Sequence, residues 1–179
     1  MRIARILSPF FVFGLAACGP QTLPSTAQLA STRAPNGAYP IGPDGSVTPG
    51  SLCPHPDSYR YPEHIGYCHR NVAPAMKRDI IAQYDRDFGY HVGSLNRGDV
   101  KIDHYIPLCM GGSNERNNLW PQYKTIYVQT DQIEEKLCEM MSRGRLKQAD
   151  AVQKMTHVKN HLDEAAQLNQ ELSRELGHG

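Results

Sequence analysis

The chain reads VKIDHYIPL at residues 100–108, GGSN at 111–114 and NLWPQ at 118–122. The first motif begins with alternating apolar and polar residues, which is typical of a half-buried strand. The GGSN cluster is rich in turn-forming residues, and the third motif has the apolar residues and the proline of a short returning strand. Together the three motifs predict a β-hairpin.

Amphipathic helices are predicted on both sides of this hairpin. Residues 72–84 place apolar side chains on one stripe and charges on the other, with Pro74 near the start, where a missing N–H is tolerated. Residues 131–141 carry apolar residues on one side and acidic residues in the first turn. The order is helix, strand, turn, strand, helix, so we expect a small α+β domain over residues 53–145.

The C-terminal residues 146–179 are predicted to form a long helix. Between residues 146 and 176, apolar residues recur at alternating intervals of three and four, which is the spacing of a heptad seam. Such a seam can pack against the domain, or it can form a homodimer by pairing with the same helix of a second copy. The sequence leaves both arrangements open.

The first 18 residues read as an export signal. Arg2 and Arg5 precede an apolar run over residues 6–17, which is shorter than the roughly 20 residues of a membrane span. The residues LAAC at 15–18 resemble the lipobox of bacterial lipoproteins, in which the cysteine, here Cys18, becomes lipidated. Ordinary secretory cleavage is the alternative. The lipobox resemblance implies an exported cell-envelope lipoprotein, held at the membrane by its lipid alone, and Gly19 favours the outer membrane.

Residues 19–52 are predicted to be a flexible linker between this anchor and the folded unit. They contain six of the 13 prolines and five of the 15 glycines, with two charged residues and no apolar period. The whole chain is nearly neutral, with 19 Lys plus Arg against 18 Asp plus Glu. This balance excludes nonspecific nucleic-acid binding driven by bulk charge.

Four cysteines remain once Cys18 is assigned to lipid, an even number in a compartment where disulfides persist. They are Cys53, Cys68, Cys109 and Cys138. Sequence order suggests that the first pairs with the second and the third with the fourth, although four cysteines allow three connectivities. A structural zinc site with His55 or His69 is the alternative, which the absence of a Cys-x-x-Cys pair disfavours.

The ordered set of Asp103-His104, PL at 107–108, GGS at 111–113 and NLWPQ at 118–122 resembles the HNH, or His-Me finger, nuclease family. A lone Asp-His pair would be weak, but the ordered set is much more specific. The matching core covers about residues 100–138. The resemblance implies a ββα-metal core that hydrolyses phosphodiester bonds of DNA or RNA with a divalent ion, usually Mg²⁺. A non-catalytic envelope module that binds nucleic acid or protein and retains this fold is the alternative.

The resemblance also implies roles for single residues. His104 would be the general base, because a neutral imidazole near pH 7 can take a proton from water. Asp103 would ligate the metal ion, and Asn118 would orient the imidazole, with the adjacent Asn117 as its competitor. Neighbouring strand residues point to opposite faces, so joint action of Asp103 and His104 at one site requires an irregular strand end.

The helix after the hairpin departs from the better-known family pattern. It lacks the final His or Asn that would complete the metal site, since the chain has no histidine between His104 and His157. Asp131 is the candidate for a further ligand, and Glu134 is the second choice. Carboxylate ligands suit Mg²⁺, although acidic residues in a first helical turn are also favoured by the helix dipole without any metal.

Overall fold

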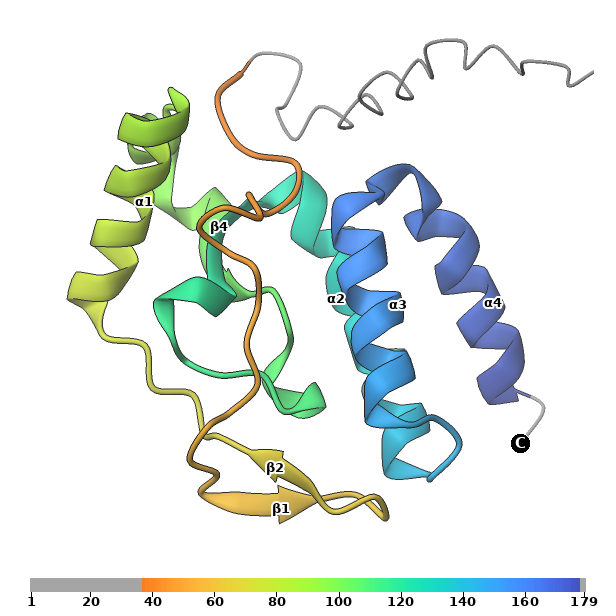
Figure 1. The fold of residues 1–179 in the computed structure, drawn as a ribbon. Helices are drawn as coiled ribbons and strands as arrows, with labels where there is room; N and C mark the ends of the chain where they lie inside the picture. The colour runs from red at the N-terminus through yellow and green to blue at the C-terminus, as the bar shows by residue number, and fades with distance from the viewer. Residues whose placement is uncertain (1–36, 178–179) are drawn as a thin grey trace, which may run out of the picture.

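The computed structural model describes residues 37–177 as a mixed α+β fold with two small antiparallel sheets and four α-helices (Figure 1). The predicted order of helix, strand, turn, strand and helix is present. In chain order the elements are β1 (Ser58–Arg60), β2 (Ile65–Tyr67), α1 (Pro74–Phe88), β3 (Val100–His104), β4 (Leu119–Tyr123), α2 (Lys124–Ser142), α3 (Gln148–Asn160) and α4 (Ala165–Gly177).

The predicted hairpin is formed by β3 and β4. The two strands pair in regular antiparallel register over their whole length, up to the last residue of β3, His104, which lies opposite Leu119. The GGSN cluster belongs to the connection between these strands. Gly111 adopts a left-handed φ of 83°, as its place in a turn suggested. Gly112 packs so closely that a Cβ atom there would lie 1.8 Å from the Ile106 carbonyl oxygen, so no larger residue fits.

Two apolar clusters stabilise the fold. One joins α1 to the β3–β4 hairpin and includes Ile80, Tyr84 and the fully buried Trp120. The other joins the three C-terminal helices and includes Ile133, Leu137, Met155, Val158 and Leu172. The hairpin therefore has its own hydrophobic support on the α1 side and meets a separate helical layer on the other.

The C-terminal tail is helical, as predicted, and is divided into two helices. The α3 helix ends at Asn160, a single 3₁₀ turn spans residues 162–164, and α4 follows. Met155, Val158 and Leu172 of the predicted seam are buried within the chain against α2. The seam is thus used for packing on the domain, and a homodimer stays a prediction.

Two disulfides join the predicted pairs, Cys53 with Cys68 and Cys109 with Cys138. The first closes the segment around β1 and β2, and the second ties the β3–β4 connection to α2. Cysteines engaged in disulfides do not ligate zinc, so the alternative of a zinc site is wrong. Disulfides are typical of an extracellular or periplasmic environment.

The segment of residues 37–52 is packed onto the domain, which corrects the prediction that the linker extends to residue 52. Thr48 is 1% exposed, and its hydroxyl lies 2.9 Å from the Tyr84 hydroxyl. The Ser51 and Ser113 hydroxyls are 2.6 Å apart, and Leu52 bridges to Gly112. The segment runs across the hairpin outside the named helices and strands (Figure 1), held by these hydrogen bonds and by apolar contacts of Tyr39, Ile41 and Val47, so it carries no helical or strand period.

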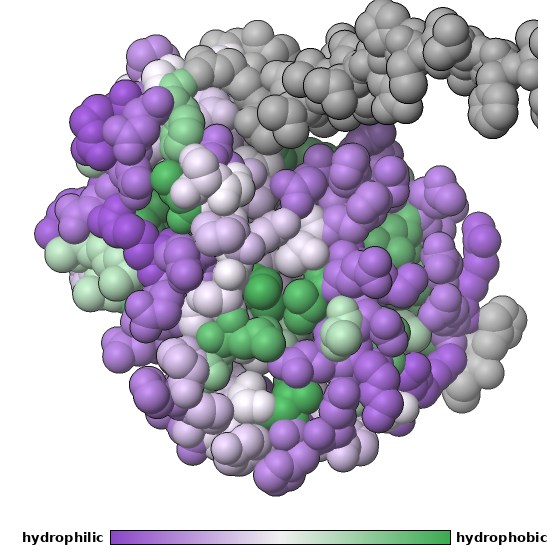
Figure 2. All heavy atoms as spheres, viewed as in Figure 1, coloured by the Kyte–Doolittle hydropathy of each residue, from purple (hydrophilic) through white to green (hydrophobic). Residues whose placement is uncertain are grey.

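Cys18, the export signal and residues 19–36 of the predicted linker lie outside the described residues. Within residues 37–177, no helix is both long and apolar enough to cross a membrane. Figure 2 shows hydrophilic side chains over most of the viewed face, including that of α3 and α4, with a smaller apolar area near its centre.

Candidate functional site

The His104 ring lies at the end of β3, beneath the side chains of Arg70 and Asn114. Only 3% of the residue is exposed. Its Nε2 lies 3.2 Å from Asn114 Oδ1, and its Nδ1 lies 3.4 Å from Arg70 Nη1. Because a guanidinium only donates hydrogen bonds, Nδ1 must be the accepting nitrogen, and Nε2 then carries the ring proton.

The orientation of the Asn114 amide supports this assignment of the ring proton. Its Nδ2 donates to the His69 carbonyl at 2.8 Å, and its Oδ1 accepts from the Asn71 N–H at 3.1 Å. The amide is therefore held with its oxygen toward the histidine, where it accepts the hydrogen bond from Nε2. A fixed tautomer with an unprotonated Nδ1 is the form in which an imidazole accepts a proton.

The pKa of His104 is lowered to about 4, mainly by burial and to a smaller extent by the positive charge of Arg70, while the hydrogen bond to Asn114 opposes the shift. An imidazole taken out of water favours its neutral form, because the charged form loses more hydration. The ring is consequently unprotonated near pH 7. It can act as a proton acceptor without first having to lose a proton to solvent.

Arg70 is the side chain in contact with Nδ1. It is itself exposed, and its Nη2 donates to the Ile102 carbonyl at 2.8 Å, so the guanidinium rests on the backbone of β3. Asn114 also lines a neighbouring cleft of about 310 Å³, together with His69 and Met76. A charged, exposed arginine thus contacts a neutral imidazole.

Sequence reasoning missed both partners of the ring. Arg70 lies 34 residues before His104 and belongs to the loop after the first disulfide, so no local motif connects the two residues. Asn114 was noticed only as a turn residue of the GGSN cluster. The signal that could have identified it is its place in the connection that returns the chain from His104.

Asn118 does not orient the imidazole, which corrects the prediction from the family resemblance. Its Oδ1 accepts from the Ile106 N–H at 2.8 Å, and its Nδ2 donates to the carbonyls of Ile106 and Ser113 at 2.9 Å each. The buried Asn118 amide therefore ties the connection between β3 and β4 together. Asn117 makes a hydrogen bond with Ser51 instead of with the ring.

Asp103 faces the other side of the strand, against the C-terminal helices. The regular pairing of β3 continues through His104, so the irregular strand end that would bring the two side chains to one site is not formed. Lys159 Nζ lies 3.2 Å from Asp103 Oδ2, and Lys101 Nζ lies 3.6 Å from Asp103 Oδ1. The two neighbours in sequence thus belong to different surroundings.

Asp103, Asp131 and Glu134 form a carboxylate cluster in which one oxygen of each lies within 4.8 Å of the others. Lys101 reaches both oxygens of Asp131, at 2.6 and 2.8 Å. Burial raises the pKa of Glu134 to about 7, against the effect of Lys159. Burial would also raise the pKa of Asp103, but Lys159 and Lys101 together hold it below its ordinary value.

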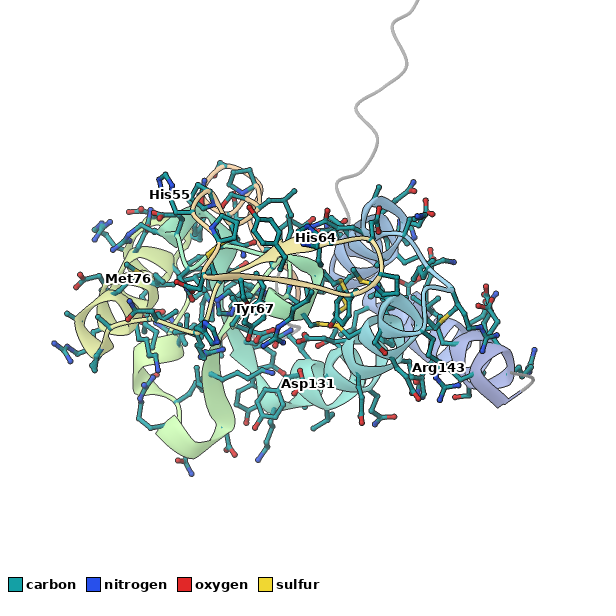
Figure 3. The ribbon with its side chains drawn as sticks, turned by 90° about the horizontal axis from the view of Figure 1, so that it is seen from below. His55, His64, Tyr67, Met76, Asp131 and Arg143 are labelled. Carbon is teal, nitrogen blue, oxygen red and sulfur yellow. A yellow bond between two sulfur atoms is a disulfide. The ribbon has the colours of Figure 1, made fainter. Side chains whose placement is uncertain are left out.

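The carboxylate cluster unites the predicted ligands Asp103 and Asp131 with the second choice, Glu134. Oxygen donors of this type suit Mg²⁺. The cluster does not fit a resident divalent ion as it stands, however, because two lysine ammonium groups already bind its oxygens. It also lies across the strand from the His104 ring. Figure 3 shows Asp131 on α2, well apart from His55 and Met76, which line the cleft beside Asn114.

Comparisons of this chain with protein-family models, with curated proteins and with solved structures found no match.

Proposed function

We propose that this chain is an exported nuclease that hydrolyses phosphodiester bonds of nucleic acid, with His104 as the general base. The observation that carries the proposal is the unprotonated Nδ1 of His104 facing the guanidinium of Arg70. A base and a cation in contact are the two groups that attack on a phosphate diester requires. The ordered motif set around Asp103-His104 supports the same reaction class.

Each residue of the site has a definite task in this reaction. When a phosphate enters, the Arg70 guanidinium turns from the ring to the phosphate oxygens, to which it donates charge-assisted hydrogen bonds. His104 Nδ1 then takes the proton of the attacking water as its oxygen bonds to phosphorus. The ester P–O bond opposite the attacking water breaks, and the leaving oxygen takes a proton from solvent. Asn114 holds the Nε2 proton and with it the reactive tautomer. No step is assigned to a metal ion, because the carboxylate cluster lies on the other face of β3.

The proposed location follows from the export signal and the disulfides. The substrate would be DNA or RNA outside the cytoplasm, and Cys18 would carry the lipid that holds the enzyme at the envelope. Because the chain as a whole is nearly neutral, with 19 Lys plus Arg against 18 Asp plus Glu, phosphate recognition would rest on a few local contacts such as Arg70.

A non-catalytic module that binds nucleic acid or protein is the second candidate. The 3% exposure of His104 favours it, because little of the residue is open to an attacking water. In such a module Arg70 would still bind phosphate, but His104 would be a structural residue. Binding without cleavage is the result that distinguishes this candidate from the nuclease.

The test is cleavage of plasmid DNA and of RNA by the purified full-length protein, in Mg²⁺ and in EDTA. His104→Ala and Arg70→Ala should each lose cleavage under whichever condition supports it. His91→Ala and Arg78→Ala, which replace exposed residues of the same types, should cleave like the wild type. Wild-type binding without cleavage, in either condition and on either polymer, would support the binding module.

A further inference from the structure

Lys159 is a fully buried lysine at the end of α3. Its exposed fraction is 0%, although lysine is almost never buried completely unless its charge is paired. The neighbouring Val158 and Met155 belong to the helical core, so the position of this side chain is fixed by packing of the tail. The C-terminal tail thereby places a positive charge inside the domain, against the last residues of β3.

The contacts of this ammonium group are those of a hard cation. Lys159 Nζ donates to the Asp103 carboxylate at 3.2 Å and to the His104 carbonyl at 2.6 Å. Carboxylate and carbonyl oxygens are also the ligands that hard metal ions take from proteins. Lysine satisfies them without a metal, since a compact ammonium with three donors can bind several oxygens at once.

Two ammonium groups face the three carboxyl groups of the cluster in this arrangement. The carboxylate cluster brings together Asp103, Asp131 and Glu134, and the ammonium groups of Lys101 and Lys159 lie among these acids. A divalent ion at Asp103 would have to displace Lys159 from the carboxylate. The freed ammonium would then stay buried beside the ion, with a like charge next to it, which is unfavourable.

We propose that the Lys159 ammonium is the resident cation of the carboxylate cluster, in the place that the family resemblance assigns to a divalent ion. The inference goes beyond the proposed nuclease activity, because it concerns the opposite face of β3 and holds for a nuclease and a binding module alike. It makes α3 an integral part of the hairpin's support. It also predicts that the fold needs no metal.

Thermal unfolding of the full-length protein in EDTA and in millimolar Mn²⁺ tests the inference, with bound Mn²⁺ counted by electron paramagnetic resonance. The wild type should melt at the same temperature in both and bind no Mn²⁺ at the cluster. Lys159→Met should melt roughly 10 °C lower in EDTA, because it leaves the buried Asp103 carboxylate with only the longer contact to Lys101 and the His104 carbonyl without its donor. Mn²⁺ should bind this variant and restore most of the loss. The partly exposed Lys154→Met, on the same helix, is the control and should behave like the wild type.

Three results would overturn the inference. They are a wild type that binds Mn²⁺ in a manner abolished by Asp131→Asn, a Lys159→Met variant as stable as the wild type in EDTA, and a destabilised Lys159→Met variant that Mn²⁺ does not rescue. If Lys159→Met does not fold, the double variant Lys159→Met/Asp103→Asn takes its place. It removes both charges and should fold without Mn²⁺, and failure of the double variant to fold would equally overturn the inference.

Discussion

The two faces of strand β3 place neighbouring side chains in opposite electrostatic surroundings. On one face, His104 is kept neutral by burial and lies beneath the exposed Arg70 and the partly exposed Asn114. On the other, Asp103 is kept charged by lysines and is closed off by α3. The comparison teaches that burial alone does not mark a structural residue. A buried neutral base beneath a movable side chain can react, whereas a buried charge with a fixed partner mainly stabilises the fold.

Replacing Asp103 should give the largest effect on stability. Asp103→Ala leaves the Lys159 ammonium buried without its carboxylate, so the free energy of unfolding should fall by about 3–5 kcal/mol. Asp131→Asn removes an exposed ion pair with Lys101 and should change the free energy of unfolding by less than about 1 kcal/mol. Urea unfolding of both variants measures the difference. Equal losses of unfolding free energy in the two variants would mean that the buried pair of Asp103 and Lys159 stabilises the fold no more than the exposed pair of Asp131 and Lys101.

Replacing Arg70 should affect the reaction and leave the fold intact. Arg70→Ala removes the cation that we propose binds the phosphate, and cleavage should slow by about 10²-fold, as expected for the loss of one charge-stabilising donor. The free energy of unfolding should change by less than about 1 kcal/mol, because the side chain is exposed. The measurement is the cleavage rate beside a urea curve. An unstable but fully active variant would place Arg70 among the structural residues.

Replacing Asn114 should have a smaller effect on the same face. Asn114→Ala removes the acceptor of the Nε2 proton, so the imidazole is free to adopt the tautomer that cannot accept a proton at Nδ1. We expect cleavage to fall by about tenfold, in the range seen when an orienting partner is lost. Asn118→Ala should instead lower stability, because it releases the β3–β4 connection. A matched loss of cleavage and stability in both variants would erase the distinction between them.

The smallest effect that distinguishes the two faces of β3 should be the dependence of the free energy of unfolding on pH. His104 has its pKa lowered to about 4 from an ordinary 6.5. Its contribution to the free energy of unfolding is therefore present above pH 6.5 and is lost as the pH falls toward 4. Glu134 has its pKa raised to about 7 from an ordinary 4.5, so its contribution is present below pH 4.5 and is lost as the pH rises toward 7. The two contributions oppose each other between about pH 4.5 and 6.5.

Glu134→Gln should remove one of these opposing contributions and leave that of His104. The variant should then lose stability as the pH falls from 6.5 to 4.5, by up to about 1.4 kcal/mol per pH unit more than the wild type does. Urea unfolding at several pH values gives both slopes. Identical slopes in the wild type and in Glu134→Gln would contradict the raised pKa of Glu134.

Local patterns in the sequence predicted the hairpin, the flanking helices and the disulfide pairing. The alternation before His104, the GGSN turn and the apolar stripes of α1 and α2 each depend on residues close together in the chain. The even number of cysteines and their order gave the two disulfides. The family motifs also directed attention to His104 and Asp103, which the structure shows to be buried at the end of β3.

The partners of these two residues could not be predicted, because they come from distant segments. Arg70 lies 34 positions before His104 in the chain, and Lys159 lies 56 positions after Asp103. The segment of residues 37–52 packs through single hydrogen bonds and a few apolar contacts outside any named helix or strand, which leave no period in the sequence. Asn118 was given the wrong partner, since its motif indicates a functional place in the hairpin but does not show where its amide points.

The rate at which the full-length protein cleaves nucleic acid, compared between the wild type and His104→Ala, tests the central claim most directly. The account predicts that loss of the general base slows cleavage by at least about 10²-fold, whereas His91→Ala cleaves at the wild-type rate. Equal rates for the wild type and His104→Ala would contradict the claim that His104 is the general base and that its face of β3 is the reactive one.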